Sequence, residues 1–184
     1  MIYPIVIYGS PVLRKVAQEI DKDYPNLDKF IEDMWNTMYH SDGVGLAAPQ
    51  VGKSIRLFVI DGSPFEEDDP KMKEFKKVFI NAKIVDEGDE GITMNEGCLS
   101  IPLLREDVER PVKIRMKYYD ENFNIHDEWF EGMAARIIQH EYDHTEGIMF
   151  TDKVAPIKKR LLKGKLQAIS KGRFNVDYKV KLPK

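Results

Sequence analysis

The sequence predicts an α+β fold, in which antiparallel β-sheets pack around a helix near residue 140 and an amphipathic helix lies close to the N-terminus. Two observations favour this class. One helix-like segment precedes a run of strand-like segments and another follows it. The two strand-like segments 112–119 and 123–130 are joined by the short turn 120–122, which favours antiparallel pairing. At 184 residues the chain is long enough to bury its own core, so we expect one domain, 1–184.

The first helix is predicted to begin at Pro25 and to end at Gly43. Its apolar residues recur every three or four positions, which is the spacing of one helix face. They are Leu27, Phe30, Ile31, Met34, Trp35 and Met38. A stripe of this kind is explained by packing on a core and needs no cofactor.

The strand-like segments follow the first helix. Residues 55–61 and 78–85 read as buried strands, and 62–77 between them, with two prolines, reads as a surface insertion. Residues 112–119 alternate in polarity and predict a hairpin with 123–130. Residues 1–7 are expected to form an irregular arm or edge strand, and 175–182 a final strand. A last helix is expected over 157–169, with apolar positions Leu161, Leu162, Leu166 and Ile169.

The charge is distributed unevenly along the chain. Residues 151–184, which we call the basic C-terminal segment, contain eleven Lys or Arg and two Asp, a net charge of +9. The whole chain has a net charge of −3, so residues 1–150 carry −12. A basic segment can contact RNA, or it can be only a solvated surface. No apolar run is long enough to span a bilayer and the N-terminus lacks the pattern of a signal peptide, so we expect a cytoplasmic location.

The segment Gln139-His140-Glu141-Tyr142-Asp143-His144 carries the strongest chemical signal. Two histidines four residues apart lie on the same face of a helix, so both imidazoles can reach one divalent metal ion. Glu141 would then stand beside the open position of the metal as a proton carrier. The alternative is that the two histidines are ordinary helix residues, since this H-E-x-x-H pattern also arises by chance.

A catalytic metal site of this type has three protein ligands. The chain contains no His or Glu after Glu146, so the third ligand should lie upstream. His40 and His126 are expected to face solvent. Cys98 is the only cysteine and lies in a loop-like segment, 95–100. A lone cysteine is often an inert core residue, but beside two histidines a thiolate would bind Zn²⁺ or Fe²⁺ well.

Three segments, GVGLAAPQ (43–50), EGCLS (96–100) and QHEYDH (139–144), resemble the signature motifs of the peptide deformylase family. The resemblance implies removal of the formyl group from formyl-methionine at the start of new polypeptides. It also implies one divalent metal per chain, Fe²⁺ in the cell, with Zn²⁺, Ni²⁺ or Co²⁺ able to substitute. By the same resemblance Cys98, His140 and His144 would bind the metal, Glu141 would be the general base and acid, and Gln50 and the N–H of Leu99 would stabilise the oxyanion.

The substrate pocket is predicted partly from helical spacing. Met133 and Ile137 lie on the same helix face as His140, so with Val44 they would form an apolar pocket for the methionine side chain, although plain core packing explains them equally well. The resemblance adds backbone hydrogen bonds from Gly45, and Glu96 and Arg105 as residues that shape the site. The expected partners are formylated nascent polypeptides and, through the basic C-terminal segment, transient contact with the ribosome. We expect a monomer that does not contact membranes.

Two other functions remain open from the residues alone. A metallopeptidase that cleaves internal peptide bonds also uses H-E-x-x-H, but the absence of a downstream ligand and the presence of Cys98 argue against it. A homologue that binds N-terminal peptides without turnover is the second alternative. A closed structural site would need four protein ligands and no glutamate base.

Overall fold

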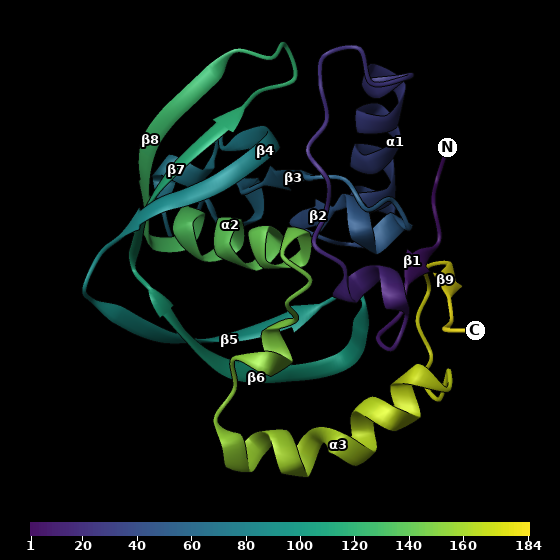
Figure 1. Cartoon of the computed structure of the whole chain (residues 1–184). Coiled ribbons are helices and arrows are strands. Elements are labelled where there is room, and N and C mark those ends of the chain that lie inside the picture. Colours follow the sequence, from purple (N-terminus) through teal and green to yellow (C-terminus); the bar gives the residue numbers. More distant parts are fainter.

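The computed structural model describes all residues 1–184 and has an α+β fold with three α-helices and antiparallel sheets, as predicted (Figure 1). The largest sheet has five strands, every neighbouring pair antiparallel, in the order β2-β3-β4-β7-β8. The bounds are β2 (Gly45–Ala47), β3 (Leu57–Asp61), β4 (Lys76–Glu87), β7 (Lys113–Tyr119) and β8 (Ile125–Glu131). The predicted hairpin is therefore confirmed as β7–β8.

A second hairpin was not expected from the sequence. β5 (Gly91–Cys98) pairs with β6 (Ile101–Pro111), in a register that runs from Gly91↔Pro111 to Gly97↔Arg105. The expectation that 95–100 is a loop is thus wrong, because Cys98 ends a long strand. In β5 the apolar Ile92 is exposed and the charged Glu96 is buried. The strand therefore lacks the polar–apolar alternation by which a half-buried strand is recognised.

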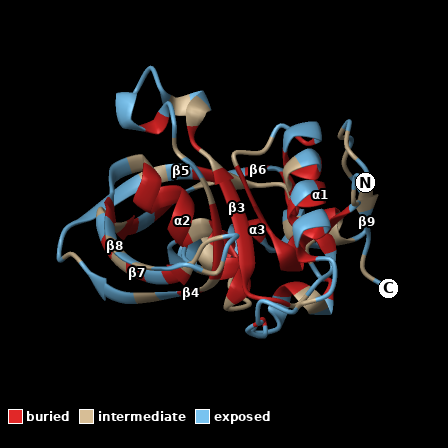
Figure 2. Cartoon of the chain, turned by 90° about the horizontal axis from the view of Figure 1, so that it is seen from above, coloured by how far each residue is buried: buried red, intermediate tan, exposed pale blue.

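The first helix, α1 (Leu27–His40), is shorter at both ends than predicted. Asn26 has a left-handed backbone conformation with φ of 56°, so the helix begins after it rather than at Pro25. The predicted apolar stripe does face the core, where Phe30, Ile31, Met34 and Met38 pack with residues of β2 and β3. Figure 2 shows buried residues concentrated on the inner side of α1, on β3 and on α2.

The helix α2 (Gly132–Thr145) lies between the five-stranded sheet and the β5–β6 hairpin (Figure 1). Ala135 and Ile138 on α2 are fully buried against the sheet. After the helix, Gly147 has a φ of 72°, and a Cβ there would lie 2.7 Å from the carbonyl oxygen of Arg14. The chain therefore needs glycine where it leaves α2.

The C-terminal part consists of α3 (Pro156–Ser170) and an extended segment that ends in β9 (Val180–Lys181). β9 pairs in parallel with β1 (Ile5–Val6), so the two chain ends lie together (Figure 1). The final strand is shorter than predicted. Of the apolar positions expected on α3, Leu162 and Ile169 are buried but Leu161 is 75% exposed, because α3 packs by one side only. None of the helices combines the length and apolar character needed to traverse a lipid bilayer.

Candidate active site

The two histidines of α2 and the cysteine that ends β5 meet in space. One ligand atom from each of Cys98, His140 and His144 lies within 4.8 Å of the others, and Cys98 Sγ is 3.4 Å from His144 Nε2. The other upstream candidates lie elsewhere. His40 is exposed at the end of α1, and His126 on β8 stacks on Tyr118. The structure thus brings together the three ligands that the sequence indicated.

The chemistry of these groups fits a divalent metal. Sulfur and imidazole nitrogen are the donors that Zn²⁺ and Fe²⁺ accept. Burial lowers the pKa of His144 well below its ordinary value, which keeps that imidazole neutral. At His140 burial is outweighed by Cys98 and Glu96, which raise its pKa well above the ordinary value, so a metal that binds here displaces a proton. Glu141 is also buried, its Oε2 has no hydrogen-bond partner, and burial raises the pKa of Glu141 to about 7. An unpaired carboxylate oxygen at this depth is suited to exchange a proton with water at the metal.

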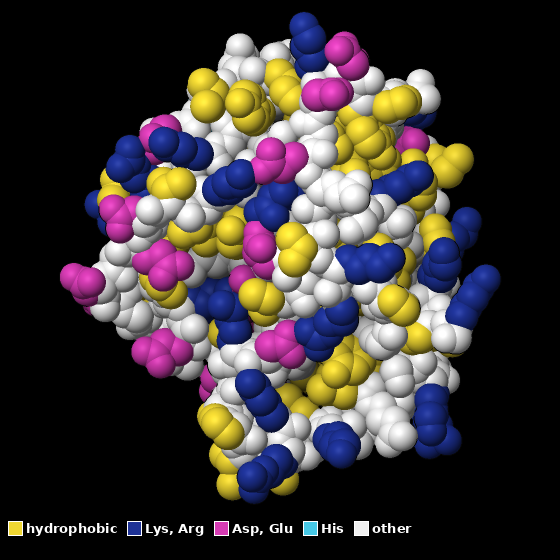
Figure 3. Space-filling model, in the orientation of Figure 1, with side chains coloured by type: hydrophobic (Ala, Val, Ile, Leu, Met, Phe, Trp, Pro, Cys, Tyr) yellow, Lys and Arg dark blue, Asp and Glu magenta, His cyan; other side chains and the backbone are white.

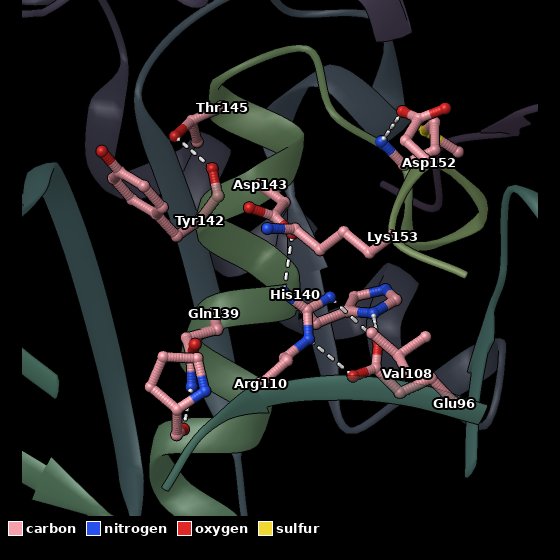
Figure 4. Close-up of polar contacts among 12 residues, drawn as sticks. Glu96, Val108, Arg110, Gln139, His140, Tyr142, Asp143, Thr145, Asp152 and Lys153 are labelled. Atoms are coloured by element: carbon pink, nitrogen blue, oxygen red, sulfur yellow. Dashed lines mark hydrogen bonds and ion pairs between the residues drawn. The ribbon is translucent and has the colours of Figure 1, made fainter. Parts of the chain in front are cut away.

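A buried ion-pair network surrounds Glu96, which lies on β5 two residues before Cys98. Glu96 Oε2 is 2.9 Å from Nδ1 of His140, and Glu96 also accepts hydrogen bonds from Arg110 on β6 and Arg136 on α2. Arg110 in turn donates to Asp143, one residue before His144, at 2.7 Å (Figure 4). Burial alone would raise the pKa of Glu96, but hydrogen bonds from His140 and Arg110 hold it well below its ordinary value.

The glycine-rich segment 43–50 closes the other side of the site. Gly45 lies so near Glu141 that a Cβ would be 2.8 Å from both Cγ and Cδ of that side chain, which explains the need for glycine. Gln50 lies in a short 3₁₀ helix (Ala48–Val51). Its Oε1 accepts the N–H of Ala47 at 2.8 Å, and its Nε2 is 3.5 Å from Cys98 Sγ and 3.3 Å from Ser100 Oγ. The amide nitrogen of Gln50 therefore faces Cys98.

A cavity of about 550 Å³ opens beside these groups. It is lined by every residue that the sequence placed in the site except His144, which lies behind it. These lining residues are Val44, Gly45, Gln50, Glu96, Cys98, Leu99, Arg105, Met133, Ile137, His140 and Glu141. Arg105 donates to the side chain of Asn95 at 2.8 Å and remains at the exposed rim.

Several residues of the site were missed from the sequence. Arg110 and Arg136 belong to the ion-pair network, but no local pattern distinguishes them from surface arginines. Phe65, from the expected surface insertion, reaches the cavity wall. Val176 and Tyr178, from the basic C-terminal segment, line it as well. Asp143 alone carried a usable signal, since it lies inside the QHEYDH motif.

Known proteins share this architecture. A family model for polypeptide deformylase matches residues 2–160. A peptide deformylase of Christiangramia forsetii is 54% identical over 190 residues, covering 100% of this chain and 97% of the relative. One from Flavobacterium psychrophilum is 55% identical, covering 99% and 97%. Among solved structures, the deformylase of Thermotoga maritima has a TM-score of 0.76 at 42% identity, covering 85% of this chain and 99% of that one. A Plasmodium falciparum deformylase bound to an inhibitor has a TM-score of 0.79 at 35% identity, covering 91% and 99%.

A Cys-His-His donor set beside a buried glutamate and an open cavity defines a metal-dependent hydrolase. Taken with the comparisons, the chain belongs to the polypeptide deformylase family. It is an enzyme that removes the N-terminal formyl group from newly synthesised polypeptides.

Proposed function

We propose that Cys98, His140 and His144 hold one divalent metal ion per chain, Fe²⁺ in the cell, and that Zn²⁺, Ni²⁺ or Co²⁺ can take its place. The observation that carries this assignment is the approach of their three ligand atoms to within 4.8 Å. When bound, the metal supplies Lewis acidity, which lowers the pKa of water toward neutrality. Metal analysis of protein purified without oxygen tests the identity of the ion, and zinc or nickel in place of iron would contradict that part.

Glu141 is the general base and acid of this proposal. Its carboxylate takes a proton from the attacking water and passes it to the amine that leaves as the new N-terminus. Two observations support the role, the unpaired Oε2 and the raised pKa of about 7, since a general base is most effective when its pKa lies near neutral pH. Gly45 contributes by leaving room for the carboxylate.

The formyl oxygen becomes negatively charged in the tetrahedral state, and we assign Gln50 Nε2 and the backbone N–H of Leu99 as its donors. Gln50 is oriented for this because its Oε1 is occupied by Ala47. The N–H of Leu99, in the turn between β5 and β6, has no hydrogen-bond partner in the protein. One donor of this kind typically contributes about 2.7–4 kcal/mol to transition-state stabilisation.

The methionine side chain of the substrate would occupy the apolar part of the cavity, against Val44, Met133 and Ile137. The backbone of Gly45 would hydrogen-bond to the peptide, and Arg105 at the rim would contact residues that follow methionine. Glu96 shapes the site through His140 rather than by an open contact of its own, since Arg110, Arg136 and His140 occupy its carboxylate.

Formate release from formyl-Met-Ala-Ser by the iron-loaded protein tests this assignment. Rapid release that is lost in Glu141→Ala, with the metal retained, supports it. Cleavage of internal bonds in unformylated peptides would favour a metallopeptidase. Binding of the peptide without release would favour a non-catalytic homologue.

We also propose that residues 1–184 form a single catalytic domain centred on α2, acting as a monomer in the cytoplasm, and that the basic C-terminal segment touches the ribosome transiently. Ile157 and Leu161 on α3 are 70% and 75% exposed among lysines, which line the lower edge of the molecule in Figure 3. Binding to ribosomes that weakens with salt and is lost when the exposed lysines of α3, Lys159, Lys163 and Lys165, are replaced by glutamate supports the contact. Salt-independent binding, or binding unaffected by these substitutions, argues against it.

A further inference from the structure

The turn between β5 and β6 is held from both chain ends. This turn, Leu99 and Ser100, directly follows the ligand Cys98. The carbonyl oxygen of Ser100 accepts the N–H of Tyr8 at 2.8 Å, just after β1. The carbonyl oxygen of Leu99 accepts the hydroxyl of Tyr178 at 2.9 Å, just before β9. The turn that carries the proposed oxyanion donor is thus fastened by two residues that lie 170 positions apart in the chain.

The segment that carries Tyr178 has one face turned toward the protein interior. From residue 174 to 180, half-buried and exposed residues alternate, as in a strand with one face inward. The inward residues are Phe174, Val176, Tyr178 and Val180. The backbone is anchored by hydrogen bonds from the N–H of Ile5 to the carbonyl of Lys179 at 2.8 Å and from Ile7 to Lys181 at 3.0 Å. Ile5 and Ile7 are fully buried, so the anchor is part of the core.

Tyr178 touches the cavity as well as the turn. Its ring and Val176 form part of the cavity wall, and the ring packs on the same core as Leu99. Burial raises the pKa of Tyr178 to about 12, so the hydroxyl remains protonated and available as a donor. The residue is also outside the region that the family model matches, which ends at residue 160.

The carbonyl and the N–H of Leu99 differ in their hydrogen bonding. The carbonyl is bound by Tyr178, whereas the N–H makes no hydrogen bond. Fixing the carbonyl of Leu99 restricts rotation about its Cα–C bond, and together with the contact from Tyr8 to Ser100 it limits movement of the turn that carries the free N–H. Such a donor stabilises developing charge best when it is already oriented before the reaction.

We propose that Tyr178 is a positioning residue for deformylation, which holds the Leu99 peptide so that its free N–H remains available to the formyl oxygen. The inference rests on the proposed oxyanion role of Leu99. With this role for Tyr178, residues 173–184 contribute to the active site and are not only a basic surface segment. Tyr178 touches neither the metal ligands nor the reacting atoms in this role; it acts through Leu99.

Tyr178→Phe removes one hydroxyl and keeps the ring. The matched control is Tyr24→Phe, since Tyr24 is also a half-buried tyrosine packed on the same core, but its hydroxyl makes no hydrogen bond and it lies outside the cavity. On formyl-Met-Ala-Ser we expect kcat of Tyr178→Phe to fall about tenfold, less than for outright loss of a donor, with KM within about twofold. The control should match the wild type in both constants.

Three further readouts separate positioning from damage to the fold. The product Met-Ala-Ser lacks the formyl oxygen, so its inhibition constant should be unchanged in Tyr178→Phe. Bound metal per chain should also be unchanged. The ¹³C carbonyl resonance of Leu99 should shift in Tyr178→Phe and stay in place in Tyr24→Phe. An unchanged kcat, an unmoved carbonyl resonance, or a loss of activity that only follows loss of metal would each overturn the proposal.

Gln50→Ala distinguishes failure of this inference from failure of the oxyanion assignment. If Gln50→Ala lowers kcat with metal retained while Tyr178→Phe does not, the oxyanion site stands and the role of Tyr178 falls. If Gln50→Ala retains full kcat, the oxyanion assignment itself fails, and the inference falls with it.

Discussion

Glu96 and His140 are joined by a 2.9 Å contact between Oε2 and Nδ1. This contact links β5, which ends at the proposed ligand Cys98, to α2, which carries both histidines. It also leaves Nε2 of His140 as the ring nitrogen available to a metal. A second group that orients a metal-bound histidine in this way commonly affects metal affinity as strongly as a ligand does.

The first prediction concerns Arg110, which holds Glu96 and Asp143 and is 2% exposed. Arg110→Met should remove the cation that Glu96 and Asp143 share, leaving Glu96 with only Arg136 and His140, and lower the free energy of unfolding by up to about 3–5 kcal/mol. Because Glu96 then orients His140 less firmly, metal affinity should fall about 10–100-fold. Urea unfolding and competition with a chelator measure the two effects.

The control for this variant is Arg115→Met. Arg115 is 42% exposed and pairs with Asp127 on the neighbouring strand, so its loss should change stability far less than the loss of Arg110 and leave metal affinity intact. Equal effects of the two substitutions would show that the buried Arg110 network contributes no more to stability and metal affinity than an exposed ion pair.

A second prediction follows from the contact between Gly45 and Glu141. In Gly45→Ala the added Cβ would overlap the side chain of Glu141, and the carboxylate must move. We expect kcat/KM to fall between about tenfold and a hundredfold, because small displacements of a catalytic group are costly. Steady-state kinetics with the metal content verified gives the measurement.

Gly164→Ala provides the opposite case. Gly164 lies inside α3 with nothing within 4 Å of an added Cβ, so alanine should stabilise the protein by about 1 kcal/mol with no change in activity. If Gly45→Ala proves as harmless as Gly164→Ala, the close approach to Glu141 is not required.

The third prediction is that Glu141→Gln retains the metal but loses about 10²–10⁴-fold in kcat, since general acid–base catalysis contributes on that scale. Glutamine keeps the shape of the side chain and cannot accept the proton. Single-turnover formate release, with metal analysis of the same sample, checks both parts. Turnover close to wild type would remove Glu141 from the mechanism.

The fourth prediction concerns pH and the metal-free protein. The pKa of Glu141 is raised in the folded state from its ordinary value of 4.5 to about 7 by burial. The folded state therefore binds the proton more tightly than the unfolded state. The stabilising contribution of the protonated carboxyl is complete below pH 4.5 and is lost as the pH rises to about 7, a change of roughly 3 kcal/mol.

Unfolding of the metal-free protein at several pH values, for wild type and Glu141→Gln, isolates this contribution. The difference in stability between the two should grow between pH 4.5 and 7 in favour of the variant. A constant difference over that range would mean that burial of Glu141 does not perturb its ionisation.

The sequence by itself determined the local features of this protein. The stripe of α1, the alternation of β7 and the one-turn spacing of His140 and His144 are visible because each depends on residues two to four positions apart. The three motifs together also indicated the family. β5 was not predicted because Ile92 is exposed while the charged Glu96 is buried, so its polarity pattern does not indicate a strand that pairs with β6.

Only the tertiary structure decided how these pieces meet. Cys98 and His144 are 46 positions apart, and their approach depends on α2 packing against the β5–β6 hairpin. Strand register places Arg110 opposite Ile92, so its ion pair with Glu96 depends on a side chain that reaches along the hairpin. The choice of Tyr178 as the partner of Leu99 follows from the β1–β9 pair. Such long-range partners leave no periodic trace in the chain, because they are set by register and packing rather than by local spacing.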